Sequence, residues 1–445
     1  MRTPPDRASP PWVVPATAGL SVIVLTMLCR DQLELVDFIS FAGRAHRLRD
    51  GGDLVHPLYP VGFPAMLTAM TALIGDVLWA GKVLAIGAGA LAVAATARML
   101  GPMPALWLLA QGALLQWGRT EGTDMPAASL ALASLAAATE RRAGWAGALA
   151  GAACMFRYTG AAVIPAALLL AGNPGIFIGA LAATTAPHWA TALLTGAPLL
   201  PDQSENLRIA AGHATSLFTT ETLERWPRGM MQASAVALRQ PATWVGAVGL
   251  AVGLARRDRR AAGLLGLAVV HLGMIGLAFA RPRLVLPATL AIAAGAAFLV
   301  PRSHPRLGWL LPLAGLPVAI GAGMALWPTT NIDGRRAAQA AAMHARPGPF
   351  LTSDPWVAVR SGGWLHGGRP LHVTGQAVAL TPRTVAASAR DQHIPWILVD
   401  RSRINRTYPG LAPLMDEESA PGLTLADRGT GWRLWAVDGV DPTGP

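Results

Sequence analysis

The sequence predicts an α-helical polytopic membrane protein of about eleven transmembrane helices, followed by a small C-terminal α/β domain. Of its 445 residues, 52% are hydrophobic and 14% are charged, and the mean hydropathy of +0.40 is too apolar for an ordinary water-soluble protein. At Pro328 the composition changes to the mixed polar and apolar pattern of a globular domain. We therefore expect a membrane domain over residues 1–327 and an α/β domain over residues 328–445.

The apolar runs are rich in Ala, Gly and Leu, which is typical of membrane helices that approach one another closely. About 20 apolar residues cross a bilayer, so the runs can be counted. The expected spans are Trp12–Arg30, Trp79–Leu100, Ala105–Gly118, Met125–Thr139, Gly144–Met155, Thr159–Ala171, Ile176–Thr195, Trp244–Ala255, Gly263–Ala280, Leu284–Val300 and Leu307–Trp327.

Loop charges orient these spans. The net charge is +11, and many basic residues fall in short loops between spans, as the positive-inside rule expects. The short, proline-headed run Leu58–Ile74 is treated as surface-lying or re-entrant, which places the basic pentad Arg256–Arg260 inside. This topology predicts a multi-pass plasma (inner) membrane protein whose active site and C-terminal domain are extracytoplasmic, with a long outer polar segment over Gly196–Gln240. Cys29 and Cys154 lie in apolar runs, so no disulfide framework is expected.

The C-terminal part has the pattern of a small sheet. Pro349–Asp354 and Pro395–Asp400 read as short buried strands that end in an acid, and Thr384–Asp391 as the helix before the second strand. Leu423–Asp427 and Trp432–Val437 form a predicted hairpin. We expect this domain to serve acceptor choice or stability rather than chemistry.

The segment after the first span combines acid, base, glycine and proline. Asp37 lies just past the apolar run, where an ionisable group is a functional candidate by default, although a marker of the membrane edge would also explain it. A basic, helix-compatible stretch leads to a His-Pro-Leu-Tyr-Pro turn at residues 56–60, whose prolines fix an extended conformation. His56 and Tyr59 in this turn are further site candidates.

A second acidic candidate lies in the polar turn Thr120–Pro126. Asp124 stands near a helix N-terminus, so simple capping would also explain it, and Glu121 precedes it by three residues. A divalent metal shared by Glu121 and Asp124 stays an open alternative. No metal site or other cofactor is predicted, because no His-x-x-x-His, Cys-x-x-Cys or Asp-x-Asp spacing occurs at an outer span end.

Arginines supply the opposite charge at the same predicted depth. Arg157 follows one span, and Arg281 and Arg283 precede another. A guanidinium binds phosphate through a planar fork that lysine lacks, although a snorkelling anchor would also explain such an arginine. His188, after Pro187, is either a hydrogen-bonded interfacial residue or a base. No phosphate-binding loop or dinucleotide fingerprint occurs, which argues against a nucleotide-driven pump and gives no support to a nucleotide-sugar donor.

Together these motifs resemble the GT-C glycosyltransferases, a superfamily that includes protein O-mannosyltransferases and lipid A aminoarabinose transferases. The aspartate after the first span, the surface helix and the 56–60 turn are similar to the family's first external loop, although that turn usually reads His-Pro-Pro. Asp124 stands in a similar Asp-hydrophobic-Pro context to the acid of the second external loop. The stretch 281–287 resembles the Arg-Tyr-hydrophobic-Leu-Pro entry to a late span, and Arg157 stands where relatives often carry a basic residue before Thr-Gly.

The resemblance implies an inverting glycosyltransferase that moves a sugar from a polyprenyl-phosphate carrier to an acceptor hydroxyl at the outer membrane face. It implies Asp37 as the catalytic carboxylate, with Asp124 as a second acid. The arginines 157, 281 and 283 would bind the donor phosphate. The acceptor is a glycan, a lipid or a protein, and no nucleic-acid partner is expected.

Two other functions stay open. A lipid-linked sugar flippase or other transporter would need alternating access, commonly built from repeats with charges at the membrane midplane, and the sequence shows no such repeat. A non-catalytic scaffold would have no need for opposed acids and arginines at one depth.

Overall fold

The computed structural model describes residues 12–29, 38–49, 60–195, 220–277, 281–300, 305–326, 334–354, 357, 369–371 and 380–442. The chain divides into two compact units, each with its own hydrophobic core. The first unit comprises Met1–Cys29, Gly52–Met66 and Gly81–Pro328, and the second comprises Arg30–Gly51, Leu67–Ala80 and Thr329–Pro445.

The described residues of the first unit form helices and connecting turns. These helices are α1 (Val13–Met27), α5 (Pro102–Leu109), α6 (Gly112–Trp117), α7 (Asp124–Thr139), α8 (Ala143–Phe156), η1 (Tyr158–Val163), α9 (Ile164–Ala171), α10 (Pro174–Thr195), α12 (Thr220–Ala237), α13 (Pro241–Ala255), α14 (Arg259–Gly276), α15 (Leu286–Ala294), η2 (Gly295–Leu299), η3 (Pro305–Trp309) and α16 (Leu310–Leu326). Two helices, α3 (Gly62–Ile74) and α4 (Val77–Leu100), have residues in both units.

Within the described residues, four helices are long and apolar enough to cross a membrane. They are Val77–Leu100, Pro174–Leu194, Arg259–Gly276 and Leu307–Met324. Six shorter apolar helices accompany them: Val13–Met27, Gly62–Ile74, Ala143–Phe156, Tyr158–Ala171, Pro241–Ala255 and Leu286–Leu299. The chain is therefore a multi-pass helical membrane protein, and the expected number of about eleven spans stays a prediction.

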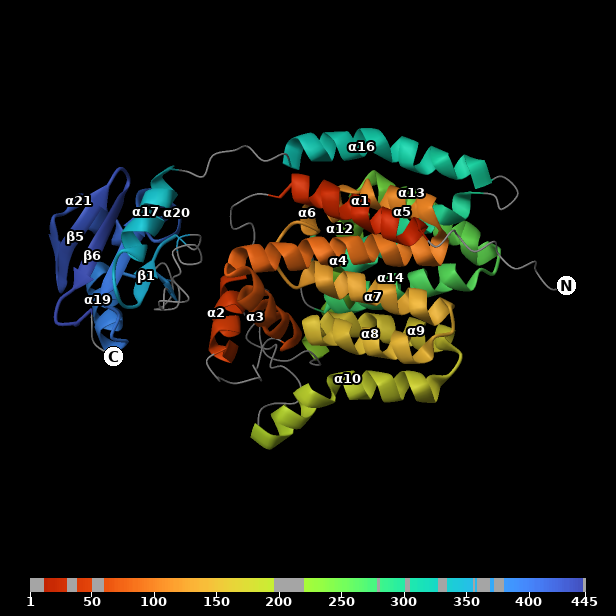
Figure 1. Ribbon diagram of the computed structural model, residues 1–445, viewed down its shortest axis with the longest axis horizontal. Helices are drawn as coiled ribbons and strands as arrows, with labels where there is room; N and C mark the ends of the chain where they lie inside the picture. The colour runs from red at the N-terminus through yellow and green to blue at the C-terminus, as the bar shows by residue number, and fades with distance from the viewer. Residues whose placement is uncertain are drawn as a thin grey trace. The chain divides into compact units, whose positions relative to one another are not determined.

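Small residues set the distance between these helices. Helix α7 is buried along nearly its whole length, and α8 packs against both α7 and α10 (Figure 1). A Cβ atom added at Gly147 on α8 would lie 2.1 Å from the carbonyl oxygen of Phe177 on α10. One added at Gly246 on α13 would lie 2.0 Å from the carbonyl oxygen of Ile292 on α15. These helices touch backbone to backbone, which only glycine allows.

Two regions differ from the expected spans. The run Ala105–Gly118 is broken between α5 and α6, where the buried Gln111 side chain donates from Nε2 to the carbonyl oxygen of Trp107 at 2.7 Å. The expected polar segment Gly196–Gln240 contains α12, an 18-residue helix that packs against α14. Its Trp226 indole donates to the carbonyl oxygen of Gly273 at 2.8 Å. Helix α12 has an apolar face among charged residues, which a count of long apolar runs misses.

The second unit contains α2 and the C-terminal sheet. The basic segment expected to be helical forms α2 (Phe38–Arg49), where the carbonyl oxygen of Ala45 accepts from the Thr68 hydroxyl at 2.9 Å. The sheet has the order β2-β1-β3-β6-β5-β4. Its strands are β1 (Phe350–Thr352), β2 (Arg369–Pro370), β3 (Trp396–Asp400), β4 (Ser419–Ala420), β5 (Leu423–Gly429) and β6 (Trp432–Val437).

This sheet is mixed. Strands β2, β1 and β3 are parallel, and β6, β5 and β4 continue from β3 as antiparallel strands. The helices of the domain are α17 (Gly334–His344), α19 (Pro382–Asp391), α20 (Arg401–Thr407), η6 (Pro409–Leu411) and α21 (Pro413–Asp416). Helix α19 is the crossover before β3, as expected, because a parallel neighbour needs a connection that returns to the same edge of the sheet. The predicted α/β pattern is confirmed.

Candidate functional site

The loop between α6 and α7 is buried although most of its side chains are polar. All six residues 119–124 are buried. Arg119 donates from Nη1 to the carbonyl oxygen of Leu28, just past the end of α1, at 3.1 Å, and the Thr120 hydroxyl donates to the carbonyl oxygen of Gln116 at 2.8 Å. Since buried polar groups must be hydrogen-bonded, these contacts allow the loop to sit inside the helix bundle. We call residues 119–124 the acidic loop.

The acidic loop ends in an ion pair between two predicted site residues. Asp124 is the first residue of α7, and its Oδ1 lies 2.6 Å from Nη1 of Arg157. The same nitrogen donates to the Thr123 hydroxyl oxygen at 3.1 Å. Thr123, not Asp124, holds the N-cap position of α7. The Asp124 side chain is 7% exposed, whereas the Arg157 side chain is 29% exposed, so the arginine is the more accessible partner of the pair.

Glu121 has a different partner from Asp124. Its Oε2 lies 3.0 Å from Nζ of Lys82 on α4, and both side chains are fully buried. The two acids of the loop are therefore each matched by a cation from a different helix or turn. In the described part of the chain, no group of three or more His, Cys, Asp or Glu side chains is arranged to hold a metal ion.

The other predicted arginines lie in the turn before α15. Arg281 is exposed and Arg283 is half-buried, and the turn closes through the amide of Leu284, which donates to the carbonyl oxygen of Arg281 at 2.9 Å. The carbonyl oxygen of Leu284 lies 2.8 Å from Nε2 of His271, a buried residue of α14. Helix α14 also packs against η1, which directly follows Arg157. One helix thus supports both turns that carry the predicted arginines.

His188 lies close to the Arg157 turn. It is buried on α10, and its ring centroid is 6.4 Å from that of Tyr158 and 5.1 Å from that of Trp189. Tyr158 is the residue after Arg157, so His188 packs beside this turn. Three other candidates, Asp37, His56 and Tyr59, lie outside the described residues.

Two residues of this region were not predicted from the sequence. Lys82 and His271 each stand alone in an apolar run and match no motif. An ionisable side chain within a membrane helix is a functional candidate by default, and that rule would have singled out Lys82. The signal for His271 is weaker, because a neutral histidine is an ordinary hydrogen-bonding residue in a helix core.

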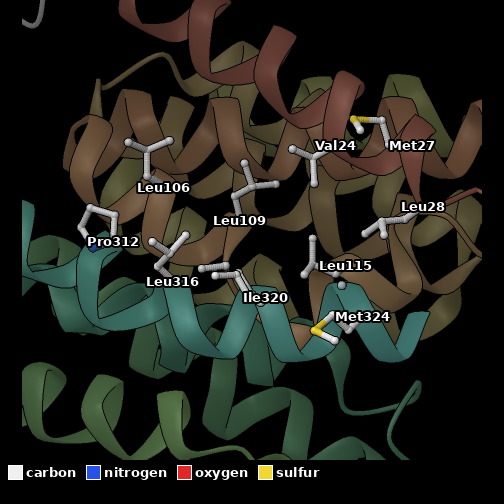
Figure 2. A pocket seen from close by; sticks show the side chains of 13 residues that line it. Val24, Met27, Leu28, Leu106, Leu109, Leu115, Pro312, Leu316, Ile320 and Met324 are labelled. Atoms are coloured by element: carbon white, nitrogen blue, oxygen red, sulfur yellow. The ribbon is translucent and has the colours of Figure 1, made fainter. Parts of the chain in front are cut away.

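An apolar pocket opens beside the start of the acidic loop. It has a volume of about 730 Å³ and lies among α1, α5, α6 and α16 (Figure 2). Its lining is apolar throughout: Val24, Met27, Leu28, Leu106, Leu109, Ala110, Leu115, Pro312, Leu316, Ala319, Ile320, Gly323 and Met324. Met324, one of its lining residues on α16, is 76% exposed. Leu28 links pocket and loop, because its side chain lines the pocket and its carbonyl oxygen accepts from Arg119.

The buried acids of the C-terminal domain have partners within that domain. Asp354, after β1, accepts from Nε of Arg336 at 2.8 Å. Asp400, at the end of β3, accepts at Oδ1 from the backbone amide of Ser402 at 2.9 Å and so caps α20. Gln339 donates to its other oxygen at 2.6 Å. These contacts hold helices to the ends of the parallel strands.

In chemical terms, the described candidates are a carboxylate beside a guanidinium and two further arginines in a supported turn. A carboxylate can accept a hydroxyl proton or orient a hydroxyl, and a guanidinium can bind phosphate through charge-assisted hydrogen bonds.

Comparison with solved structures finds matches over nearly the whole chain. ArnT from Cupriavidus metallidurans bound to undecaprenyl phosphate matches with a TM-score of 0.58 at 14% sequence identity, covering 98% of this chain and 99% of that one. ArnT in the apo state matches at 0.57 and 14%, covering 96% and 97%. The Archaeoglobus fulgidus oligosaccharyltransferase in complex with Zn and sulfate matches at 0.55 and 12%, covering 95% and 73%.

Neither the protein-family models nor the curated proteins match this sequence. At these low identities the structural likeness establishes the fold, and it agrees with the resemblance seen in the loop motifs. The chain is a multi-pass membrane protein with the fold of the GT-C glycosyltransferases.

Proposed function

We propose that the protein is an inverting glycosyltransferase that takes a sugar from a polyprenyl-phosphate donor. The observation that carries the proposal is the Asp124–Arg157 pair, a buried carboxylate 2.6 Å from a partly exposed guanidinium within a GT-C fold. ArnT, which has this fold, has been solved with undecaprenyl phosphate bound. That precedent supports a lipid-linked donor for the present chain.

The proposed reaction is a single displacement. Asp37, assigned by its likeness to the family's catalytic aspartate, accepts the proton of an acceptor hydroxyl as the hydroxyl oxygen attacks the anomeric carbon. The bond between that carbon and the phosphate oxygen breaks, and the sugar transfers with inversion. Polyprenyl phosphate departs with the bonding electron pair. No cofactor is needed to balance the reaction.

The arginines serve the leaving group. Arg157, Arg281 and Arg283 stabilise the negative charge that develops on the phosphate, an electrostatic contribution that is usually the largest single one in catalysis. Asp124 holds Arg157 in place through the ion pair, and a partly exposed guanidinium can add a phosphate oxygen without losing the carboxylate.

The apolar pocket is the proposed place for the isoprenoid chain. Its volume of about 730 Å³ falls in the range of ligand-binding pockets. Its lining contains no polar side chain, so a hydrocarbon chain can fill it without desolvating a polar group. Leu28 connects it to the acidic loop through the hydrogen bond from Arg119.

The deciding experiment is release of product. Purified protein in lipid vesicles is incubated with a polyprenyl-phosphate sugar and a panel of glycan, lipid and peptide acceptors, and free polyprenyl phosphate is measured. Acceptor-dependent release is expected. Movement of the lipid-linked sugar across the vesicle membrane without release would identify a flippase instead.

The proposed orientation is tested separately. Cysteine accessibility is expected to place position 37, position 124 and position 281 on the outer face, and Arg257 on the inner face. If positions 37 and 257 proved accessible from the same side, the proposed outer-face site would be wrong.

A further inference from the structure

The ion pair between Lys82 and Glu121 is fully buried, where a charged group is energetically unfavourable. Lys82 lies within α4, one of the four long apolar helices, and Glu121 lies in the middle of the acidic loop. Both side chains have no exposed surface, and Nζ and Oε2 are 3.0 Å apart.

Such a pair is a poor device for stability alone. Removing two charges from water costs as much as their attraction returns, or more, and two well-packed apolar side chains would stabilise the fold equally well. A charged pair instead adds conformational specificity, because it joins two particular atoms and disfavours other conformations of the same loop. The ion pair between Glu121 and α4 is therefore best explained by its effect on the position of the loop backbone.

The acidic loop needs such an attachment. Residues 119–123 lie outside helices and strands, and Gly122 has a φ of 151°, a conformation that favours glycine. At its start the loop is tied to α1 by Arg119, and at its end Thr123 and Asp124 are tied to Arg157. Glu121 ties the middle to α4, three residues before Asp124.

We propose that Lys82 and Glu121 form a positioning pair that sets the path of the acidic loop and so presents Asp124 to Arg157. Neither residue touches substrate or exchanges a proton in the reaction. The inference rests on the proposed function for its effect on turnover. Its structural part, a fixed loop, stands independently of any activity.

The central variant is Lys82→Met with Glu121→Met, which removes both charges of the pair. The single changes Lys82→Met and Glu121→Gln each leave one member of the pair buried without the other and are expected to fold poorly. Val93→Ala is the matched control, because Val93 is a fully buried residue of the same helix and its truncation weakens packing without touching a charge.

Hydrogen exchange of the protein in nanodiscs gives the first readout. In the double variant, amides 119–124 are expected to exchange at least tenfold faster than in the parent protein, while thermal unfolding and the exchange of the rest of α7 stay unchanged. Val93→Ala is expected to leave the acidic loop protected. Parent-like protection of amides 119–124 in a folded double variant would overturn the inference, whether or not any transferase activity is found.

Steady-state kinetics give the second readout. A displaced Asp124 is expected to lower kcat by roughly tenfold to a hundredfold, because small errors in position have effects of this size, with little change in the KM for donor. A faster-exchanging loop with parent-like kcat would also contradict the inference. Failure of the proposed function would look different, since the parent protein itself would then release no polyprenyl phosphate.

Discussion

The Nε2 atom of His271 lies 2.8 Å from the carbonyl oxygen of Leu284, in the turn that carries Arg281 and Arg283. A carbonyl oxygen only accepts, so Nε2 carries the hydrogen. His271 is 1% exposed, so this contact lies inside the helix bundle. It supports an arginine-bearing turn.

Replacing His271 tests that support. His271→Phe keeps a ring but removes the donor, so the turn loses a hydrogen bond of about 1 kcal/mol, and donor KM is expected to rise roughly fivefold. His271→Gln can still donate and is expected to lie closer to the parent. The measurement is donor KM in the transfer assay. Equal donor KM for parent and His271→Phe would show that the turn is held by its other contacts.

The Asp124–Arg157 pair predicts a second outcome. Asp124→Asn keeps the shape of the side chain but removes the negative charge that pairs with Arg157, so kcat/KM is expected to fall by roughly tenfold to a hundredfold. Arg157→Lys keeps the charge but loses the planar fork, so kcat/KM is expected to fall by a similar factor. A variant of either kind with parent-like kcat/KM would remove the pair from the proposed site.

Asp37 and Arg283 are expected to fail in different ways. Asp37→Asn removes proton acceptance, so turnover should fall by roughly a hundredfold or more while donor binding is largely kept. Arg283→Ala should instead weaken donor capture, because phosphate pairing is already made in the ground state. Donor binding and single-turnover rates measured for both variants separate the two roles. Near-normal transfer by Asp37→Asn would exclude it as the base.

The apolar pocket can be filled without disturbing the fold. A Cβ atom at Gly323 or at Gly321 on α16 would meet no atom within 4 Å, but only Gly323 lines the pocket. Gly323→Leu is expected to displace one or two methylene groups of the donor chain, at about 0.8 kcal/mol each, and to weaken donor binding roughly four- to fifteenfold. Gly321→Leu is the control and is expected to bind normally. Equal binding by the two variants would place the isoprenoid chain elsewhere.

The acids of the C-terminal domain are expected to matter for stability rather than chemistry. Asp400→Asn weakens the cap of α20 and Asp354→Asn breaks the pair with Arg336, so each should lower the stability of the domain by about 1 kcal/mol. Thermal unfolding measures this effect, and turnover per folded molecule is expected to stay within a factor of two or three. Complete loss of turnover in a folded variant would assign the acid a chemical role.

The sequence alone indicated a polytopic helical membrane protein and a small C-terminal α/β domain, and it singled out Asp124 and Arg157 as candidates. Apolar runs and strand patterns are local, because a helix in lipid must satisfy its own backbone and a short buried strand has a recognisable composition. The acids and arginines could be picked out because charge is rare among so many apolar residues.

Only the tertiary structure decided which of these groups meet. Glu121 pairs with Lys82, 39 positions away, whereas Asp124, three residues later, pairs with Arg157. Helices rich in Ala and Gly present similar small side chains on every side, so their sequences do not specify which faces pack together. That packing alone brings α4 to the acidic loop and His271 to the Arg281–Leu284 turn, because contacts between distant residues depend on helix faces that no local pattern marks.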